Sequence, residues 1–309
     1  MQHVPYVGSG PYCYANSFAM MFGDAAPSTA VIEFSTSSPF GMQLIGGSLP
    51  FFDPYGWDPE AGFDGALEAL GWTSEISKGG DAEDALSRLR SALKDGPVWV
   101  GPVEMGHLRH QPGMTGPIEA DHYVVALTLD EERVLMHDPQ GYPYAALPIG
   151  DFMAAWEAKT LTYGEPFTMR WGFRRVADVS EPDAIRASTP AAIHWLSMRT
   201  DRPMPAGSFG NADAAEALAA LIEGGCDKDL RAHLIHFAVR VGTRRAADAA
   251  TCLSRVGLLK SAAIAGEQAR LIGALQYPLV VRKDGEAAEA LRRLAPTYDR
   301  LLAALRGGE

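Results

Sequence analysis

The amino-acid pattern changes near residue 176, and this change limits the fold more than any other feature. Before it, the chain is rich in glycine, proline and aromatic residues, with short apolar runs typical of strands. After about residue 206, alanine, leucine and arginine dominate, and apolar positions recur at three- and four-residue spacings, as in amphipathic helices. We therefore predict two domains, residues 1–176 and residues 177–309, of which the second is helical.

The first predicted domain combines helices with an antiparallel sheet. One helix is expected directly after the turn-forming residues 8–11, and the turn at 130–132 separates two β-like runs. The expected helices are 14–23, 63–70, 81–93 and 151–158, and the expected strands are 97–105, 122–130 and 132–139. An early helix followed by antiparallel strands is typical of an α+β fold, whereas alternating strands and helices would indicate a parallel sheet.

The second predicted domain is a helical bundle or cap. Five amphipathic helices are expected, at 212–223, 229–241, 244–256, 260–275 and 285–306. The segment 180–211 before them contains four prolines and reads as a short helix flanked by connecting chain. Cys226 and Cys252 lie in the helical part, and we expect both to be packing residues.

The sequence favours a cytoplasmic protein without a metal or another cofactor. No run of about 18 apolar residues is present, so no membrane span is expected, and we expect no secretory signal. Three scattered cysteines do not indicate a disulfide scaffold or a structural zinc, and reduced thiols fit a cytoplasmic location. His233 and His236 are three residues apart but lack a third ligand nearby, so they do not indicate a metal site.

The net charge of −11 is unevenly distributed along the chain. Residues 1–150 carry 6 Lys and Arg against 19 Asp and Glu, a net charge of −13, whereas residues 151–309 carry 21 basic and 19 acidic residues. An acidic N-terminal half argues against nucleic acid as a partner. It is compatible with a cationic substrate such as an amine, and equally with a surface that only keeps the protein soluble.

Cys13 lies at the predicted start of a helix, after a turn rich in glycine and proline. Helix N-termini present N–H groups and a partial positive charge, and both stabilise a thiolate. Because the thiolate is the nucleophilic form of cysteine, this position suits a reactive residue. Taken alone, however, Cys13 is better explained as a small buried hydrophobic residue.

His122 and Asp138 strengthen the case for a reactive Cys13. His122 begins one predicted strand, and Asp138 ends the next. Antiparallel strands joined by a tight turn bring the start of the first beside the end of the second. An aspartate that accepts from one imidazole nitrogen fixes the tautomer and leaves the other nitrogen to take a proton from the thiol. The three residues together predict a catalytic triad of nucleophile, base and orienting carboxylate.

The segments around these three residues carry a family resemblance. They are VPYVGSGPYCYANSFAMMFG around the cysteine, DGPVWVGPVEM, and ADHYVVALTLDEERVLMHDP from the histidine to the aspartate. In these segments residues 1–175 resemble papain-like peptidases, in the branch that contains bacteriocin-processing peptidases. With EFSTSSPFGMQLIGG, VEMGHLRH and the helical tail, the whole chain resembles the butirosin-biosynthesis protein H family. That resemblance implies a papain-like domain followed by a helical domain.

The resemblance also implies acyl transfer through an acyl-cysteine in the biosynthesis of a natural product, with Cys13, His122 and Asp138 as the catalytic residues. The implied donor is a thioester of an acyl carrier protein or of coenzyme A, and the implied acceptor is a small molecule that bears an amine. If a carrier protein docks, we expect it on the more basic helical half, near four arginines. They are Arg240, Arg244, Arg245 and Arg255.

The chain departs from the papain-like pattern at Val7, where those enzymes place a glutamine that helps to bind the oxyanion. The oxyanion would then be bound by the Cys13 backbone N–H and a further donor, with Ser9 and Asn16 as candidates. Because a thioester is easier to attack than an amide, the valine favours acyl transfer.

Four further residues are candidates for substrate binding. Glu104 and His107 lie in the loop that precedes His122, Glu33 follows the nucleophile helix, and Asp53 lies among aromatic residues. Acidic groups beside aromatic rings suit a cationic amine, but solvated loops and helix caps explain the same residues.

Two other functions fit the same residues. A cysteine peptidase or amidase would use the same triad with water as the second nucleophile. A catalytically silent papain-like domain would bind a partner and leave Cys13 unreactive. The sequence fixes neither the acyl group nor the oligomeric state.

Overall fold

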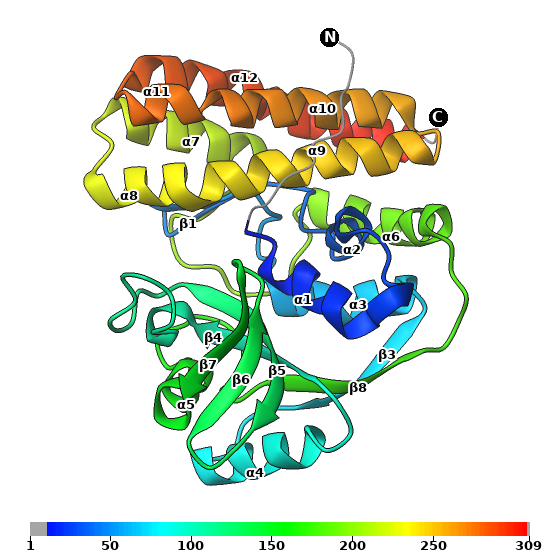
Figure 1. Ribbon diagram of the computed structural model, residues 1–309. Helices are drawn as coiled ribbons and strands as arrows, with labels where there is room; N and C mark the ends of the chain where they lie inside the picture. Colours follow the sequence, from blue (N-terminus) through cyan, green and yellow to red (C-terminus); the bar gives the residue numbers. More distant parts are fainter. Residues whose placement is uncertain (1–10, 308–309) are drawn as a thin grey trace. The chain divides into compact units, whose positions relative to one another are not determined.

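The computed structural model describes residues 11–307, which form two compact units (Figure 1). The first, named here the sheet unit, contains Tyr12–Thr29 and Gly71–Asp178. The second, named the helical unit, contains Ala30–Leu70 and the chain from Val179 onward. All strand pairs are antiparallel and the C-terminal part is helical, so the predicted α+β class is confirmed.

The sheet unit is built around a six-stranded sheet with the strand order β3-β8-β4-β5-β6-β7. Its strands are β3 (Trp72–Ser77), β4 (Val98–Glu104), β5 (Asp121–Leu129), β6 (Arg133–Asp138), β7 (Tyr142–Pro148) and β8 (Met169–Arg175). Its helices are α1 (Cys13–Phe22), α4 (Ala82–Ala92) and α5 (Ile149–Glu157). The elements predicted within these residues are present, with ends shifted by no more than two residues, and β3, β7 and β8 are additional.

Side chains alternate along the strands and give the sheet two different faces. On one face, Val100 and Val124 join an apolar core with residues of α4 and α5. On the other, the Phe18 ring of α1 stacks on Trp99 with centroids 4.9 Å apart, and Tyr123 lies beside the same Trp99 ring at 4.8 Å. The sheet is therefore covered by α1 on one face and by α4 and α5 on the other.

The turn between β5 and β6 follows from its own side chains. The Asp130 carboxylate accepts hydrogen bonds from the backbone N–H groups of Glu132 at 2.8 Å and Arg133 at 2.7 Å. An aspartate that bonds the backbone two and three residues ahead stabilises a tight turn. This turn fixes the hairpin, so the beginning of β5 lies beside the end of β6.

The helical unit contains a small sheet with the strand order β2-β1-β9 and most of the helices. Its strands are β1 (Gln43–Ile45), β2 (Leu49–Phe51) and β9 (Phe209–Gly210). Its helices are α2 (Thr29–Ser35), α3 (Pro59–Ala69), α6 (Glu181–Leu196), α7 (Asn211–Glu223), α8 (Lys228–His233), α9 (Val239–Arg255), α10 (Leu259–Ala274), α11 (Gln276–Val280) and α12 (Asp284–Gly307). Among the described residues, no helix combines the length and apolarity needed to cross a membrane.

Two expectations for the helices after residue 178 need correction, and α3 begins four residues before the predicted helix 63–70. The predicted break at 241–244 is absent, because α8 continues through a π-helical stretch, Leu234–Ala238, into α9. A Cβ on Gly242 would lie 2.5 Å from the Phe52 side chain, so this glycine permits close packing and does not end the helix. The segment expected to hold a short helix instead contains the sixteen-residue α6.

Residues 30–70 belong to the helical unit, which departs from the predicted domain of residues 1–176. The unit boundary at Asp178 lies close to the predicted one. However, β1 pairs with β9, with Gln43 opposite Gly210, and this pairing joins residues 30–70 to the helices. Such a pairing between distant segments has no local pattern that would show it in the sequence.

Candidate active site

His122 and Asp138 lie side by side at the end of the sheet where β5 begins. The register places Val125 opposite His137, so the start of β5 and the end of β6 meet, as expected for a hairpin. The His122 Nε2 lies 2.8 Å from the Asp138 Oδ1, and both side chains are buried. The contact predicted between the two residues is therefore present.

This contact fixes which nitrogen of the His122 ring carries a proton. An ionised carboxylate can only accept, so Nε2 donates to the Asp138 Oδ1. In the neutral ring, Nδ1 then keeps its lone pair and is the atom that can take a proton. The arrangement is the one that a general base needs when a carboxylate sets its orientation.

The Asp138 carboxylate accepts four hydrogen bonds. Oδ1 accepts from His122 and from the backbone N–H of Gln140, each at 2.8 Å. Oδ2 accepts from the Nε2 atoms of His110 at 2.8 Å and Gln111 at 2.7 Å. Burial alone would raise the pKa of Asp138, but the hydrogen bonds from His110 and His122, the His122 charge and the Gln140 N–H hold it well below its usual range. Asp138 is therefore ionised at neutral pH.

His110 and Gln111 are site residues whose contact with Asp138 the sequence does not reveal. They lie in the loop 105–120, which connects β4 and β5 and contains a 3₁₀ turn at Met105–His107. The available signal is a histidine shortly before the predicted base. Because an irregular loop has no periodicity, nothing in the spacing shows that these side chains meet Asp138.

Cys13 is the first residue of α1, at the helix end that carries the partial positive charge (Figure 1). One turn further along the helix, the Ser17 hydroxyl donates to the Tyr123 carbonyl oxygen at 3.3 Å. The Tyr14 ring packs edge-on against the Tyr123 ring, with centroids 5.9 Å apart. Since Tyr123 directly follows His122, the first turns of α1 lie beside the start of β5.

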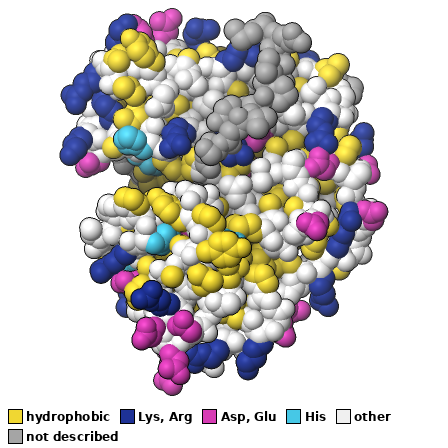
Figure 2. All heavy atoms as spheres, viewed as in Figure 1, with side chains coloured by type: hydrophobic (Ala, Val, Ile, Leu, Met, Phe, Trp, Pro, Cys, Tyr) yellow, Lys and Arg dark blue, Asp and Glu magenta, His cyan; other side chains and the backbone are white. Residues whose placement is uncertain are grey.

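The Cys13 side chain lies at the edge of the buried face of α1. Cys13 is half-buried, whereas Tyr14 and Ser17 are buried. The half-buried side of the helix continues with Asn16 and Met20. Figure 2 shows hydrophobic side chains gathered on the face of the sheet unit that this view presents. No acidic residue lies in the first turn of α1 to oppose a thiolate.

Of the two predicted oxyanion donors, Ser9 and Asn16, the structure describes only Asn16. Ser9, like Val7, lies outside the described residues. Asn16 is half-buried on α1, and its backbone N–H is used within the helix, where it donates to the Tyr12 carbonyl oxygen at 2.9 Å. Of the groups of Asn16, therefore, the side chain is the one that could assist the Cys13 backbone N–H.

Glu104 anchors the loop 105–120 and is 1% exposed. Its two carboxylate oxygens accept four hydrogen bonds, from both ends of the loop and from a neighbouring segment. The donors are the backbone N–H groups of Gly106, Ile118 and Glu119 and the hydroxyl of Thr160. A carboxylate occupied in this way does not offer the substrate contact predicted for it, whereas His107 ends the 3₁₀ turn half-buried and stays a candidate.

Replacing Glu104 with glutamine should lower the free energy of unfolding by about 1–3 kcal/mol at pH 7, because one acceptor oxygen must replace two among buried donors. Burial alone would raise the pKa of Glu104, but hydrogen bonds, first from Thr160 and then from backbone N–H groups, lower it below its ordinary value of 4.5. The carboxylate therefore stabilises the fold above that ordinary pKa, and this contribution is lost as the pH falls through the lowered pKa. Urea unfolding should show that the difference in unfolding free energy between wild type and Glu104→Gln shrinks below pH 4.5.

The exposed neighbour Glu119 supplies a matched control for this experiment, because its interaction with Glu104 uses its backbone. Glu119→Gln should leave stability within about 0.5 kcal/mol of wild type. A Glu104→Gln effect that stays constant from neutral to acid pH would contradict the assignment of the carboxylate as the anchor.

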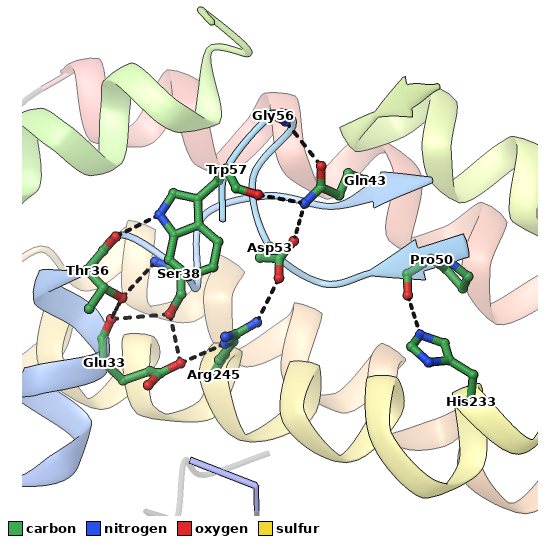
Figure 3. Close-up of polar contacts among 10 residues, drawn as sticks. All are labelled: Glu33, Thr36, Ser38, Gln43, Pro50, Asp53, Gly56, Trp57, His233 and Arg245. Carbon is green, nitrogen blue, oxygen red and sulfur yellow. Dashed lines mark hydrogen bonds and ion pairs between the residues drawn. The ribbon is translucent and has the colours of Figure 1, made fainter. Parts of the chain in front are cut away.

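Glu33 and Asp53 lie in the helical unit and bind one buried arginine (Figure 3). The Arg245 Nε donates to the Glu33 Oε1 at 2.7 Å, and an Arg245 Nη1 donates to the Asp53 Oδ2 at 3.1 Å. Ser38 also donates to Glu33, and Gln43 donates to Asp53. The two acids thus belong to a different unit from the triad residues, and their charge is met by Arg245 and not left for an amine.

The four arginines expected to dock a carrier protein do not form a free basic patch. Arg245 is buried against its two carboxylates. Arg255 binds Glu181 at 2.5 Å, and the Arg244 Nε lies 3.6 Å from a carboxylate one turn along α9. Arg240 is exposed. The expected docking surface is therefore largely neutralised within the helical unit.

His233 contacts a backbone carbonyl group within the helical unit. Its Nε2 lies 2.7 Å from the Pro50 carbonyl oxygen, and burial lowers its pKa. Within residues 11–307, no group of three or more His, Cys, Asp or Glu residues is arranged to hold a metal ion.

Two comparisons relate this chain to known proteins, one over its helical C-terminal part and the other over nearly its whole length. Residues 205–306 match the model of the YobF C-terminal domain family. In an alignment over 304 residues that covers 95% of each chain, the sequence is 27% identical to Uncharacterized protein YobF of Bacillus subtilis (strain 168). The similarity includes residues of both units, and the name of that relative specifies no activity.

Proposed function

We propose that the chain is a cysteine-dependent acyltransferase whose sheet unit has a papain-like fold. In this proposal, Cys13 takes an acyl group from a thioester and passes it to an amine of a natural-product precursor. The observation that carries the proposal is the buried contact of 2.8 Å between His122 and Asp138 at the end of the sheet. An oriented imidazole together with a cysteine at a helix N-terminus is a combination that activates a thiol.

The positions of Cys13, His122 and Asp138 on α1, β5 and β6 support the papain-like fold. The cysteine begins a helix that packs on an antiparallel sheet, and the histidine and aspartate come from two adjacent strands of that sheet. The contact of Ser17 with Tyr123 ties the second turn of α1 to the residue after His122. The proposal requires the Cys13 thiol to reach the His122 Nδ1 at this end of the sheet.

The reaction would proceed in two acyl-transfer steps, and His122 takes up and returns one proton in each. His122 Nδ1 removes the thiol proton, and the Cys13 sulfur attacks the thioester carbonyl. The carbon–sulfur bond of the donor breaks, and the imidazolium gives its proton to the leaving thiolate. The acceptor amine then attacks the acyl-cysteine, His122 takes the amine proton, and Cys13 leaves with it as the thiol. Asp138 stays ionised and stabilises the imidazolium in both steps.

Intact mass spectrometry with small acyl thioesters tests the proposal. Wild-type protein should gain the mass of one acyl group, and Cys13→Ala should gain none, whereas the matched variant Cys226→Ala should be acylated normally. Discharge of the acyl group should be faster with added amines than with water alone. Discharge by water alone would assign the site to hydrolysis, and turnover that persists in Cys13→Ala would exclude the whole scheme.

Iodoacetamide should label Cys13 much faster than the other two cysteines near neutral pH. Burial, followed by the Asp248 charge, raises the pKa of the Cys252 thiol to about 12, and burial also raises the pKa of Cys226. Both thiols therefore hold little thiolate at pH 7. Peptide mapping after short exposures measures the three rates. Equal and slow labelling of all three thiols would instead favour a silent binding domain.

A further inference from the structure

We propose that His110 and Gln111 are positioning residues that hold Asp138, and through it the base His122, in the geometry for reaction. This inference rests on the proposed function. His110 and Gln111 both donate to the Asp138 Oδ2, at 2.8 Å and 2.7 Å, whereas His122 donates to Oδ1. The two sets of donors therefore take opposite oxygens of one carboxylate.

Because donors bind both oxygens of Asp138, its carboxylate cannot rotate as it could in a simple His–Asp pair. A carboxylate can turn about its last side-chain bond, because that torsion has a broad energy profile. Two donors on Oδ2, and the Gln140 N–H on Oδ1, fix both the plane of the Asp138 carboxylate and the oxygen that faces His122. The imidazole consequently has one fixed acceptor, which holds its ring and its tautomer.

The loop 105–120 is itself held in place, so it can act as a rigid support. Glu104 binds backbone N–H groups near both ends of the loop. A Cβ on Gly106 would lie 1.9 Å from the Gly116 carbonyl oxygen, so the two ends approach each other closely. Leu108 is fully buried in the apolar core of the sheet unit. The loop therefore presents its donors with little conformational freedom.

His110 is a positioning residue and not a second base. Its Nε2 is directed at Asp138, its ring lies edge-on to Tyr142 with centroids 5.4 Å apart, and its Nδ1 is buried. Only 10% of its side chain is exposed. A ring enclosed in this way does not meet a substrate in the described arrangement, so its effect on the reaction passes through Asp138.

The test uses variants that keep shape and remove the donor. His110→Phe retains a ring against Tyr142, and Gln111→Met retains the length of the side chain. His110→Gln can restore a donor to Oδ2. His137→Phe is the matched control, because His137 precedes Asp138 in β6 but instead accepts from the Tyr144 N–H at 3.1 Å. Two readouts are needed, the acylation rate constant of Cys13 and the ¹⁵N NMR signals of the His122 ring.

His110→Phe and Gln111→Met should each lower the maximal acylation rate by about 10- to 100-fold, the loss typical when a hydrogen-bond partner that orients a metal-binding histidine is removed. The thioester concentration at half-maximal rate should change little, because neither residue binds the donor. The ¹⁵N signals of His122 should shift from one Nε2–H tautomer to a mixture in both variants. His110→Gln should recover most of the rate, and His137→Phe should keep the wild-type values.

The possible results separate this inference from the proposed function. A single His122 tautomer together with unchanged acylation in both variants would overturn the positioning role and leave the acyltransferase proposal intact. If wild-type protein forms no acyl-cysteine, the acyltransferase proposal fails. In that case the His122 tautomer decides the positioning role by itself, because its measurement needs no activity.

Discussion

Replacing Asp138 with asparagine should slow the acylation of Cys13 by roughly 10⁴-fold, the loss known for the same change in a serine-protease triad. Asp138 presents two acceptor oxygens to four donors. Asparagine presents one oxygen, and its amide group is itself a donor. The variant therefore cannot satisfy both sides of the site.

Each orientation of the new amide harms the site in a different way. If the amide oxygen faces His122, the NH₂ group points at the donors of His110 and Gln111. If the amide turns over, the NH₂ group faces the His122 Nε2, and the imidazole must carry its proton on Nδ1. The first orientation leaves buried donors unsatisfied, at about 1–3 kcal/mol each. The second removes the lone pair that should take the thiol proton.

Single-turnover acylation by a small thioester, followed by intact mass, measures the effect of Asp138→Asn. The matched control is Asp130→Asn, which makes the same change in the exposed turn between the same two strands. The control should acylate at the wild-type rate. Acylation of Asp138→Asn within about tenfold of wild type would show that the carboxylate does not set the tautomer of the base.

The hairpin that carries His122 and Asp138 can be predicted because its signals are local. Runs of apolar, largely β-branched or aliphatic residues mark β5 and β6, and Asp130 marks the turn between them. Once the turn is fixed, the register of an antiparallel pair brings the two functional residues together without any knowledge of the remaining fold. The position of Cys13 at the start of α1 is likewise a local signal.

The parts that the sequence does not reveal depend on contacts between distant segments. The strand β8 pairs with both β3 and β4, which lie far before it in the chain. The two-residue strand β9 gains its partner only through β1. Such pairings depend on which segments meet after folding, and short strands carry too few residues to show a period of their own.

The same limit applies to the site and to the acidic candidates. His110 reaches Asp138 through an irregular loop, so its sequence position contains no sign of the contact. Asp53 looked suited to an amine because it stands among aromatic residues in the sequence, and Glu33 was a candidate because it follows the nucleophile helix. Their partner is Arg245, about two hundred residues later, and only the folded chain brings it to them.

Replacing Arg245 with methionine should lower the free energy of unfolding of the helical unit by about 3–5 kcal/mol. The arginine side chain is 8% exposed and binds Glu33 and Asp53, whose side chains are 1% and 9% exposed. Its guanidinium also lies 5.6 Å from the centre of the Trp57 ring. Methionine keeps much of the volume but leaves two buried carboxylates without this cation, and isolated buried charges are strongly unfavourable.

Urea unfolding followed by far-ultraviolet circular dichroism measures this loss, because most helices belong to the helical unit. The matched control is Arg292→Met, since Arg292 pairs with Glu223 at an exposed site, where solvent screens the ion pair and its loss should hardly change stability. Adding Glu33→Gln and Asp53→Asn to Arg245→Met should restore part of the lost stability, because the neutral side chains no longer require a cation. An Arg245→Met variant as stable as the Arg292→Met control would show that the buried network does not hold residues 30–70 against α9.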